Sequence, residues 1–183
     1  EGMEDIGEMT LIEDSEDDAI LLLNELRRGG FDPIWERVET PEGMLSELKE
    51  KEWDIILSDY AMPHFSGINA LILLKESDID IPFIIISGAI SEETAVELMR
   101  AGAHDYVRKG KFTRLIPAVE RELREAEIRR RRQQAEDTII VQNEFLRNVL
   151  ESISNPFYVV DAENFNVLMA NSKARLRSIK GIT

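Results

Sequence analysis

The sequence predicts an α/β fold in which a parallel sheet carries helices on both of its faces. Short apolar runs of strand length alternate along the chain with amphipathic segments of helical periodicity. Helix start and stop residues flank the amphipathic segments. Several runs, such as residues 83–86 (FIII), are apolar at consecutive positions, which suits strands buried on both faces. Repeated strand-then-helix units favour parallel over antiparallel pairing.

Five strands are expected, and each is followed by a segment with helical signals. The strands are predicted at residues 9–12 (MTLI), 33–38 (PIWERV), 54–58 (DIILS), 82–87 (PFIIIS) and 105–109 (DYVRK). Capping residues predict helix starts at Ser15, at Thr40–Pro41, at Ser66 or Gly67, and at Ser91. Glycines are expected to end the first and fourth helices, at Gly29–Gly30 and Gly102.

The fifth helix is predicted to be far longer than the others. It begins near Phe112, and no stop signal precedes about Ile153. Eight positions in its second half follow a 4-3 spacing: Ile128, Arg132, Ala135, Ile139, Gln142, Leu146, Val149 and Ile153. This heptad seam predicts a coiled coil, and hence a homodimer formed through the long helix.

Asn155–Pro156 should break the long helix, and residues 157–176 then alternate like two strands around a turn. A lone hairpin is not stable by itself, so a second domain is expected to begin here. The expected organisation is a disordered tail or expression-vector remnant over 1–8, an α/β domain over 9–125, a coiled-coil helix over 126–154, and the start of another domain over 155–183.

The charge is distributed unevenly. Residues 1–60 hold 19 acidic and five basic side chains, so the first third carries the whole net charge of −14. Nucleic acid would be repelled there, whereas a metal cation would be attracted. The four arginines at 129–132 are interpreted as a solvated face, with nucleic-acid binding as the disfavoured alternative.

Targeting and redox signals are few. The chain has no cysteine, which excludes disulfides and thiolate metal sites. No secretory signal is recognisable at the start, and no apolar run is long enough to cross a bilayer. A cytoplasmic location without membrane contact is therefore expected.

Polar side chains stand at the ends of four predicted strands: Glu13, Asp14, Asp59, Ser87, Tyr106 and Lys109. In parallel sheets, ligands bind beyond the carboxyl ends of the strands. Carboxylates gathered there repel one another unless a proton or a cation intervenes. An oxygen-only ligand set suits Mg²⁺, and a hard cation suits phosphate, so the pattern allows attack by Asp59 on phosphorus.

At these positions the chain resembles the receiver domain of two-component response regulators. The resemblance covers about residues 8–125 and is carried by IEDSEDD, LSDYAMPHFSG, IIISG and GAHDYVRKG. It implies a flavodoxin-like (βα)5 fold with strand order 2-1-3-4-5. It also implies that Asp59 accepts a phosphoryl group from a histidine kinase or a histidine phosphotransfer protein.

The resemblance implies further roles at the strand ends. Asp14 and Asp59 would bind Mg²⁺ together with the backbone carbonyl of Ala61, and Glu13 would assist through water. Ser87 and Lys109 would bind the phosphoryl group.

Tyr106 would be an aromatic switch coupled to Ser87. Simpler interpretations are a turn-capping hydroxyl for Ser87 and a plain core aromatic for Tyr106. Glu16, Asp17 and Asp18 are interpreted only as favourable charges at a helix start. The family usually has proline after the lysine, but here Gly110 stands there, which puts the usual cis peptide in doubt.

Residues 148–174 are similar to the opening of a PAS sensor domain preceded by its helical linker. Receivers followed by PAS domains usually belong to longer signalling proteins, often histidine kinases, although no kinase ATP-binding motif occurs in this chain. Two alternatives stay open: an interaction module that is never phosphorylated, and a Mg²⁺-dependent aspartyl-phosphate phosphohydrolase. The second is disfavoured because such enzymes place a general-acid aspartate where this chain has Ala61.

Overall fold

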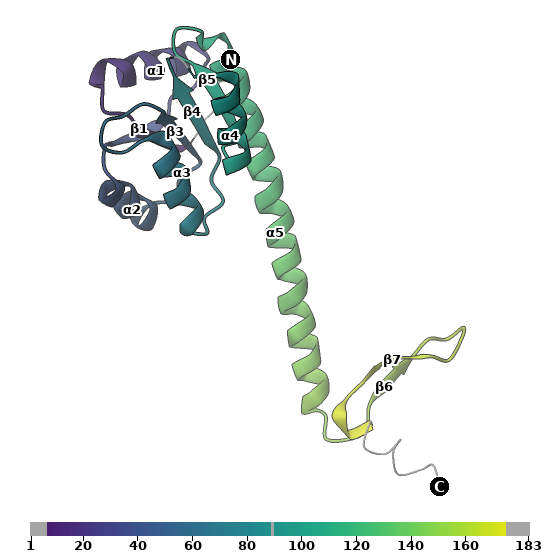
Figure 1. Cartoon of the computed structure of the whole chain (residues 1–183). Helices are drawn as coiled ribbons and strands as arrows, with labels where there is room; N and C mark the ends of the chain where they lie inside the picture. The colour runs from purple at the N-terminus through teal and green to yellow at the C-terminus, as the bar shows by residue number, and fades with distance from the viewer. Residues whose placement is uncertain (1–6, 89, 175–183) are drawn as a thin grey trace. The chain divides into compact units, whose positions relative to one another are not determined.

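A computed structural model of the chain describes residues 7–88 and 90–174. It contains the five predicted strand–helix units, the long helix and the hairpin (Figure 1). The elements are β1 Glu8–Ile12, α1 Glu16–Arg28, β2 Ile34–Val38, α2 Pro41–Glu50, β3 Ile55–Asp59, α3 Gly67–Glu76, β4 Phe83–Ser87, α4 Glu92–Ala101, β5 Asp105–Arg108, the 3₁₀ turn η1 Phe112–Arg114, α5 Leu115–Ser152, β6 Tyr158–Val160 and β7 Val167–Ala170.

The large sheet is parallel throughout, and its strand order is β2-β1-β3-β4-β5. This confirms the predicted fold class and the order implied by the resemblance. Strand β1 begins one residue before Met9, because Glu8 pairs with Ile34 and its N–H donates to the Asp54 carboxylate at 3.1 Å. The expected tail over 1–8 thus loses Glu8 to the sheet, and residues 1–6 lie outside the described part of the chain.

Helix starts follow the sequence signals closely. The side chains of Ser15, Thr40, Ser66 and Ser91 each accept a hydrogen bond from the backbone N–H three residues later. Gly102 ends α4 in the left-handed conformation, with a φ of 103° that other residues rarely adopt.

Two apolar layers enclose the sheet because successive strand residues point to opposite faces. On one face, residues such as Leu11 and Leu57 pack against α1 and the first turns of α5. On the other face, residues such as Ile56 and Ile85 pack against α2, α3 and α4. Strands β3 and β4 are buried along their whole length, as their continuous apolar runs predicted.

The N-terminal turns of α5, called here the root of α5 (residues 115–122), are linked to β5 by charged groups. Arg121 donates to the carboxylates of Asp105 and Glu122, at 2.7 Å in both cases. Asp105 and Glu122 are both buried, so each needs this shared cation. Asp105 also accepts the backbone N–H of Tyr106 at 2.7 Å. Strand β5 and the first turns of α5 are therefore linked directly by these bonds.

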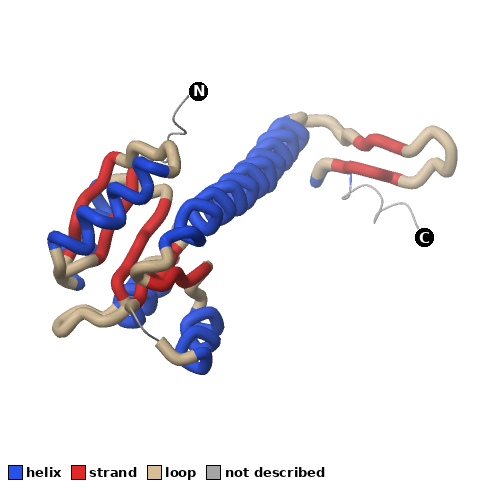
Figure 2. Tube along the Cα trace, turned by 90° about the horizontal axis from the view of Figure 1, so that it is seen from above, coloured by secondary structure: helices blue, strands red, loops and turns tan. Residues whose placement is uncertain are grey.

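The chain divides into two compact units, residues 1–128 and 129–183. Helix α5 belongs to both as a single unbroken helix of 38 residues, drawn in blue in Figure 2. Four apolar residues of the predicted heptad seam are between 44% and 61% exposed: Ile128, the last residue of the first unit, and Ile139, Leu146 and Val149 in the second. Among the described residues, no helix is both long and apolar enough to span a membrane.

The second unit contains the predicted hairpin, β6 paired antiparallel with β7. Asn171 closes it onto the end of α5, donating to the carbonyls of Leu150, Ile153 and Asn155 at 2.9–3.3 Å. The side-chain oxygen of Asn171, Oδ1, accepts a hydrogen bond from the N–H of Phe157 at 3.0 Å. Because Asn171 is fully buried and so thoroughly bonded, it fixes the hairpin to the helix end.

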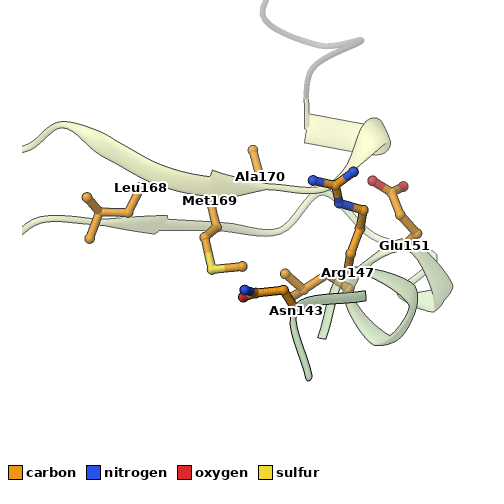
Figure 3. A pocket seen from close by; sticks show the side chains of 7 residues that line it. Asn143, Arg147, Glu151, Leu168, Met169 and Ala170 are labelled. Atoms are coloured by element: carbon orange, nitrogen blue, oxygen red, sulfur yellow. The ribbon is translucent and has the colours of Figure 1, made fainter. Parts of the chain in front are cut away.

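A cavity of about 550 Å³ lies within this second unit (Figure 3). It is lined by the last turns of α5 and by β7, through Asn143, Arg147, Leu150, Glu151, Leu168, Met169 and Ala170. Apolar residues of both strands, such as Tyr158 and Leu168, are about 60% exposed, so the hairpin does not complete a core among the described residues.

Candidate functional site

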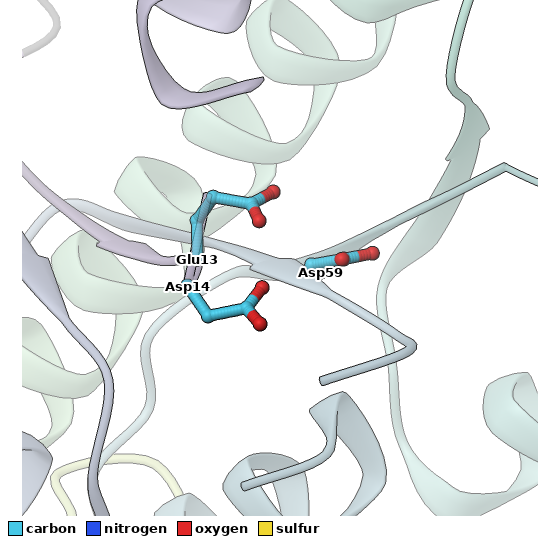
Figure 4. Close-up of side chains that lie close together, drawn as sticks. All are labelled: Glu13, Asp14 and Asp59. Carbon is cyan, nitrogen blue, oxygen red and sulfur yellow. The ribbon is translucent and has the colours of Figure 1, made fainter. Parts of the chain in front are cut away.

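Three carboxylates meet at the carboxyl edge of the large sheet (Figure 4). Glu13 and Asp14 directly follow β1, and Asp59 is the last residue of the adjacent strand β3. One carboxylate oxygen from each residue lies within 4.8 Å of those from the other two. Glu13 and Asp59 are buried, whereas Asp14 is exposed. The structure thus brings together the acidic residues that the sequence had singled out.

Backbone groups hold two of these carboxylates in place. The N–H of Ser15 donates to Glu13 Oε1 at 3.0 Å, and the N–H of Ala61 donates to Asp59 Oδ1 at 3.4 Å. Gly67, at the start of α3, lies close to the backbone at the end of β3: a Cβ there would lie 2.6 Å from the backbone oxygen of Asp59. Only glycine permits this approach, so the turn after β3 depends on it.

Lys109 is the cation of the site. Its Nζ lies 3.0 Å from Asp59 Oδ2, 3.1 Å from Glu13 Oε2 and 2.5 Å from Asp18 Oδ2. An ammonium group has three N–H donors, and here each has a carboxylate acceptor. The Lys109 backbone N–H also donates to the carbonyl of Ser87 at 2.7 Å, which links the ends of β4 and β5.

Burial and charge act in opposite directions on the titrating groups. Burial raises the pKa of Glu13, and the hydrogen bonds from Ser15 and Lys109 offset this only in part. For Lys109, burial lowers the pKa, but hydrogen bonds to Asp18, Asp59 and Glu13 outweigh it, so its pKa lies above the usual value. The ammonium group is therefore charged at every physiological pH.

The raised pKa of Glu13 predicts how stability depends on pH. A carboxyl group whose pKa is higher in the folded state stabilises the fold below its unfolded pKa, near 4.5, and loses that contribution as pH rises through the folded pKa. We expect Glu13→Gln, which resembles the protonated acid, to be more stable than wild type at pH 7 in chelator. The gain should vanish near pH 4, as urea unfolding at several pH values would show; a gain that grows on acidification would contradict this.

The carboxylate set fits a hard divalent cation. All three ligand candidates supply oxygen, the ligand type that Mg²⁺ prefers, and the exposed side of Asp14 leaves room for water. Burial is the main cause of the raised pKa of Glu13, and the nearby Asp59 carboxylate raises it further. Glu13, Asp14 and Asp59 could hold such an ion.

The remaining predicted site residues lie at neighbouring strand ends. Ser87 is the buried last residue of β4, one position beyond the partner of Asp59 in the sheet. Tyr106 is half-buried in β5, and the guanidinium of Arg114 lies 5.9 Å from its ring centroid. Tyr106 thus adjoins the 3₁₀ turn that precedes α5, while Ser87 follows the strand partner of Asp59.

Two features of the site differ from the expectations. Asp18 does lie in the first turn of α1, but the interpretation that it only favours the helix dipole is wrong, because it also bonds Lys109. Helical periodicity could have indicated this, since Asp18 lies one turn before the buried Leu22. At Gly110 no cis peptide is present, nor at any other described residue, and the glycine adopts a φ of 79° that proline cannot reach.

Comparisons with known proteins agree with this geometry. The profile of the response regulator receiver domain family matches residues 9–120. The chain is 39% identical over 80 residues to the transcriptional regulatory protein ZraR of Salmonella typhimurium, covering 43% of this chain and 18% of that protein. It is 33% identical over 86 residues to the phosphate regulon regulator PhoB of Klebsiella pneumoniae, covering 46% of this chain and 37% of that protein.

Solved receiver structures resemble this chain as well. The receiver domain of a LuxO repressor protein from Vibrio parahaemolyticus superposes with a TM-score of 0.60 and 28% identity, covering 67% of this chain and 93% of that one. The chain spans less than two fifths of ZraR and of PhoB, so each likeness concerns only a part of those regulators. Fold, carboxylate set and family profile lead to one conclusion: this chain belongs to the response regulator receiver domain family of two-component signalling proteins.

Proposed function

We propose that Asp59 is the phosphoacceptor of this receiver and takes its phosphoryl group from a phosphohistidine on a kinase or phosphotransfer protein. A carboxylate oxygen of Asp59 attacks phosphorus and forms an acyl phosphate. The phosphorus–nitrogen bond of the donor breaks, and its electron pair returns to the imidazole, which takes up a proton from water. Hydrolysis of the acyl phosphate later restores the carboxylate.

The observation that supports this most strongly is the 3.0 Å contact between Lys109 Nζ and Asp59 Oδ2. A charged donor already beside the attacking carboxylate can bond a phosphoryl oxygen on the same residue with little rearrangement. The buried hydroxyl of Ser87, at the next strand end, is proposed as a second donor to that group.

Mg²⁺ is proposed as the cofactor, held by Asp14, Asp59 and the backbone carbonyl of Ala61, with Glu13 assisting through water. When bound, it would neutralise negative charge on the transferring phosphoryl group. The chain's own residues orient the attacking oxygen: the N–H of Ala61 holds Asp59 Oδ1, which leaves Oδ2 facing Lys109.

Incubation with acetyl phosphate tests this function without a protein donor. The intact mass of the wild type should rise by one labile phosphoryl group in Mg²⁺ and not in chelator, and Asp59→Asn should gain nothing. A wild type that gains none would favour an interaction module, and rapid continuous release of phosphate from many donors would favour a phosphohydrolase.

The phosphorylated state is proposed to act through the face formed by α4, β5 and α5. Ser87 and Tyr106 would move together, and Asp105 and Arg121 would pass the change from β5 to the root of α5. We expect the Ser87→Ala variant to accept the phosphoryl group. Phosphorylation should then leave the packing of its α5 dimer unchanged, so hydrogen exchange along α5 should be the same before and after phosphorylation. A change in hydrogen exchange as large as that of the wild type would contradict the proposed role of Ser87.

The output is proposed to be a parallel coiled-coil dimer of α5 that controls a PAS domain beginning near residue 155. The exposed apolar seam and the hairpin fixed by Asn171 support this organisation. The expected boundaries, with the receiver over 9–125, the helix over 126–154 and the PAS fragment over 155–183, belong to the same proposal. Residues 175–183 lie outside the described part.

A further inference from the structure

Asp18 stands apart from the other acidic residues of the site because its carboxylate bonds Lys109 but is not one of the three that could hold a cation. Its Oδ2 is 2.5 Å from Lys109 Nζ, and this is the shortest of the three contacts that the ammonium makes. We propose that Asp18 is a positioning residue that holds Lys109 beside Asp59 during phosphoryl transfer. The inference rests on the proposed function for its consequence, although the contact can be measured without any phosphodonor.

The division of the carboxylates explains why such an anchor is useful. Glu13, Asp14 and Asp59 form the set that could hold a cation, and Asp18 is not a member of it. A cation bound there would compete with Lys109 for Glu13 and Asp59. Asp18 would then be the one carboxylate that stays hydrogen-bonded to the Lys109 ammonium. It would occupy one N–H and leave the other two to face phosphoryl oxygens.

The segment around Lys109 gives little support of its own. Gly110 has a φ of 79°, and a Cβ at that position would meet no atom within 4 Å. Backbone bonds from Lys109 to Ser87 and from Lys111 to Arg108 fix the main chain but not the long side chain. Four rotatable bonds separate Nζ from the backbone, so a carboxylate is needed to restrict them.

The backbone of Asp18, in contrast, is held by contacts of α1. Its N–H donates to the capping side chain of Ser15 at 3.3 Å, and the next residue, Ala19, is buried in the core between α1 and the sheet. The Asp18 carboxylate is 38% exposed, which suits a group that directs a charge rather than one that stabilises the fold. Helix α1 thereby orients a lysine from β5.

Asp18→Asn tests the proposal, with Asp17→Asn as its matched control. Both variants remove one negative charge from the first turn of α1, but Asp17 is exposed, and the described carboxylates that pair with Lys109 are those of Glu13, Asp18 and Asp59. Three quantities are compared: order of the ¹⁵N-labelled Lys109 ammonium by NMR relaxation in chelator, Mg²⁺ affinity by calorimetry, and phosphorylation rate with acetyl phosphate.

We expect Asp18→Asn to mobilise the Lys109 ammonium, to weaken Mg²⁺ binding because the lysine then depends on Glu13 and Asp59, and to slow phosphorylation about three- to tenfold. Asp17→Asn should match the wild type in ammonium order and change the other two quantities far less. Asp18→Glu, which keeps the charge, should recover part of the rate.

Equal behaviour of Asp18→Asn and Asp17→Asn would overturn the proposal, and so would a mobile ammonium with an unchanged rate. If the wild type itself accepts no phosphoryl group, the proposed function fails. In that case ammonium order and Mg²⁺ affinity decide whether Asp18 anchors Lys109: unchanged values in Asp18→Asn reject the anchor, and changed values support it.

Discussion

Lys109→Met should destabilise the metal-free receiver by about 3 kcal/mol, because it leaves the buried carboxylates of Glu13 and Asp59 without a cation. The Lys109 side chain is only 21% exposed, so water compensates little of this loss. Lys111→Met is the matched control, since Lys111 is exposed and two residues away. Its free energy of unfolding should stay within about 0.5 kcal/mol of the wild type.

Mg²⁺ should stabilise Lys109→Met more than it stabilises the wild type, because no ammonium then competes for the carboxylates. Stabilisation by a ligand grows with its concentration relative to the dissociation constant, reaching about 2.7 kcal/mol at a hundredfold excess. Urea unfolding with and without Mg²⁺ measures the difference. Equal stabilisation of both proteins would mean that Lys109 and the cation do not share a site.

Ile139→Asp should convert the proposed dimer into a monomer, whereas Ile140→Asp should not. The two isoleucines are neighbours on α5 and are both 56% exposed, but only Ile139 lies on the heptad seam. In a parallel dimer the seam position would bring two carboxylates into an apolar interface, weakening association at least about 100-fold.

Sedimentation equilibrium on both variants separates the seam from general exposure of apolar residues. Phe145 and Leu146 give a second matched pair, because Leu146 is on the seam and Phe145 is not. If the four aspartate variants weaken association equally, the interface does not follow the heptad. If none changes it, α5 is not the dimer contact.

Local signals in the sequence were sufficient for most of the receiver fold. Ser15, Thr40, Ser66 and Ser91 cap their helices because a short polar side chain can reach the free N–H groups of the first turn. The buried strands were visible because they are apolar at every position. Strand order needed the resemblance, since alternation alone does not say which strands are neighbours.

The candidate site was predictable as far as each residue ends a strand or directly follows one. Glu13, Asp14, Asp59 and Lys109 all do, and parallel strands end at one edge of the sheet. Asp18 was missed because it lies inside a helix, where its partner is set by how α1 packs on the sheet. Likewise, the buried role of Asn171 depends on contacts with residues 150–157 that no local pattern reveals.

Reduction of the phosphorylated protein with borohydride tests the central claim most directly. Borohydride converts an acyl phosphate on aspartate to the alcohol, so peptide mass mapping locates the residue that carried phosphorus. The account predicts homoserine at position 59 alone, only when acetyl phosphate and Mg²⁺ were both present. A reduced residue at another position, or reduction at position 59 that is independent of Mg²⁺, would contradict it.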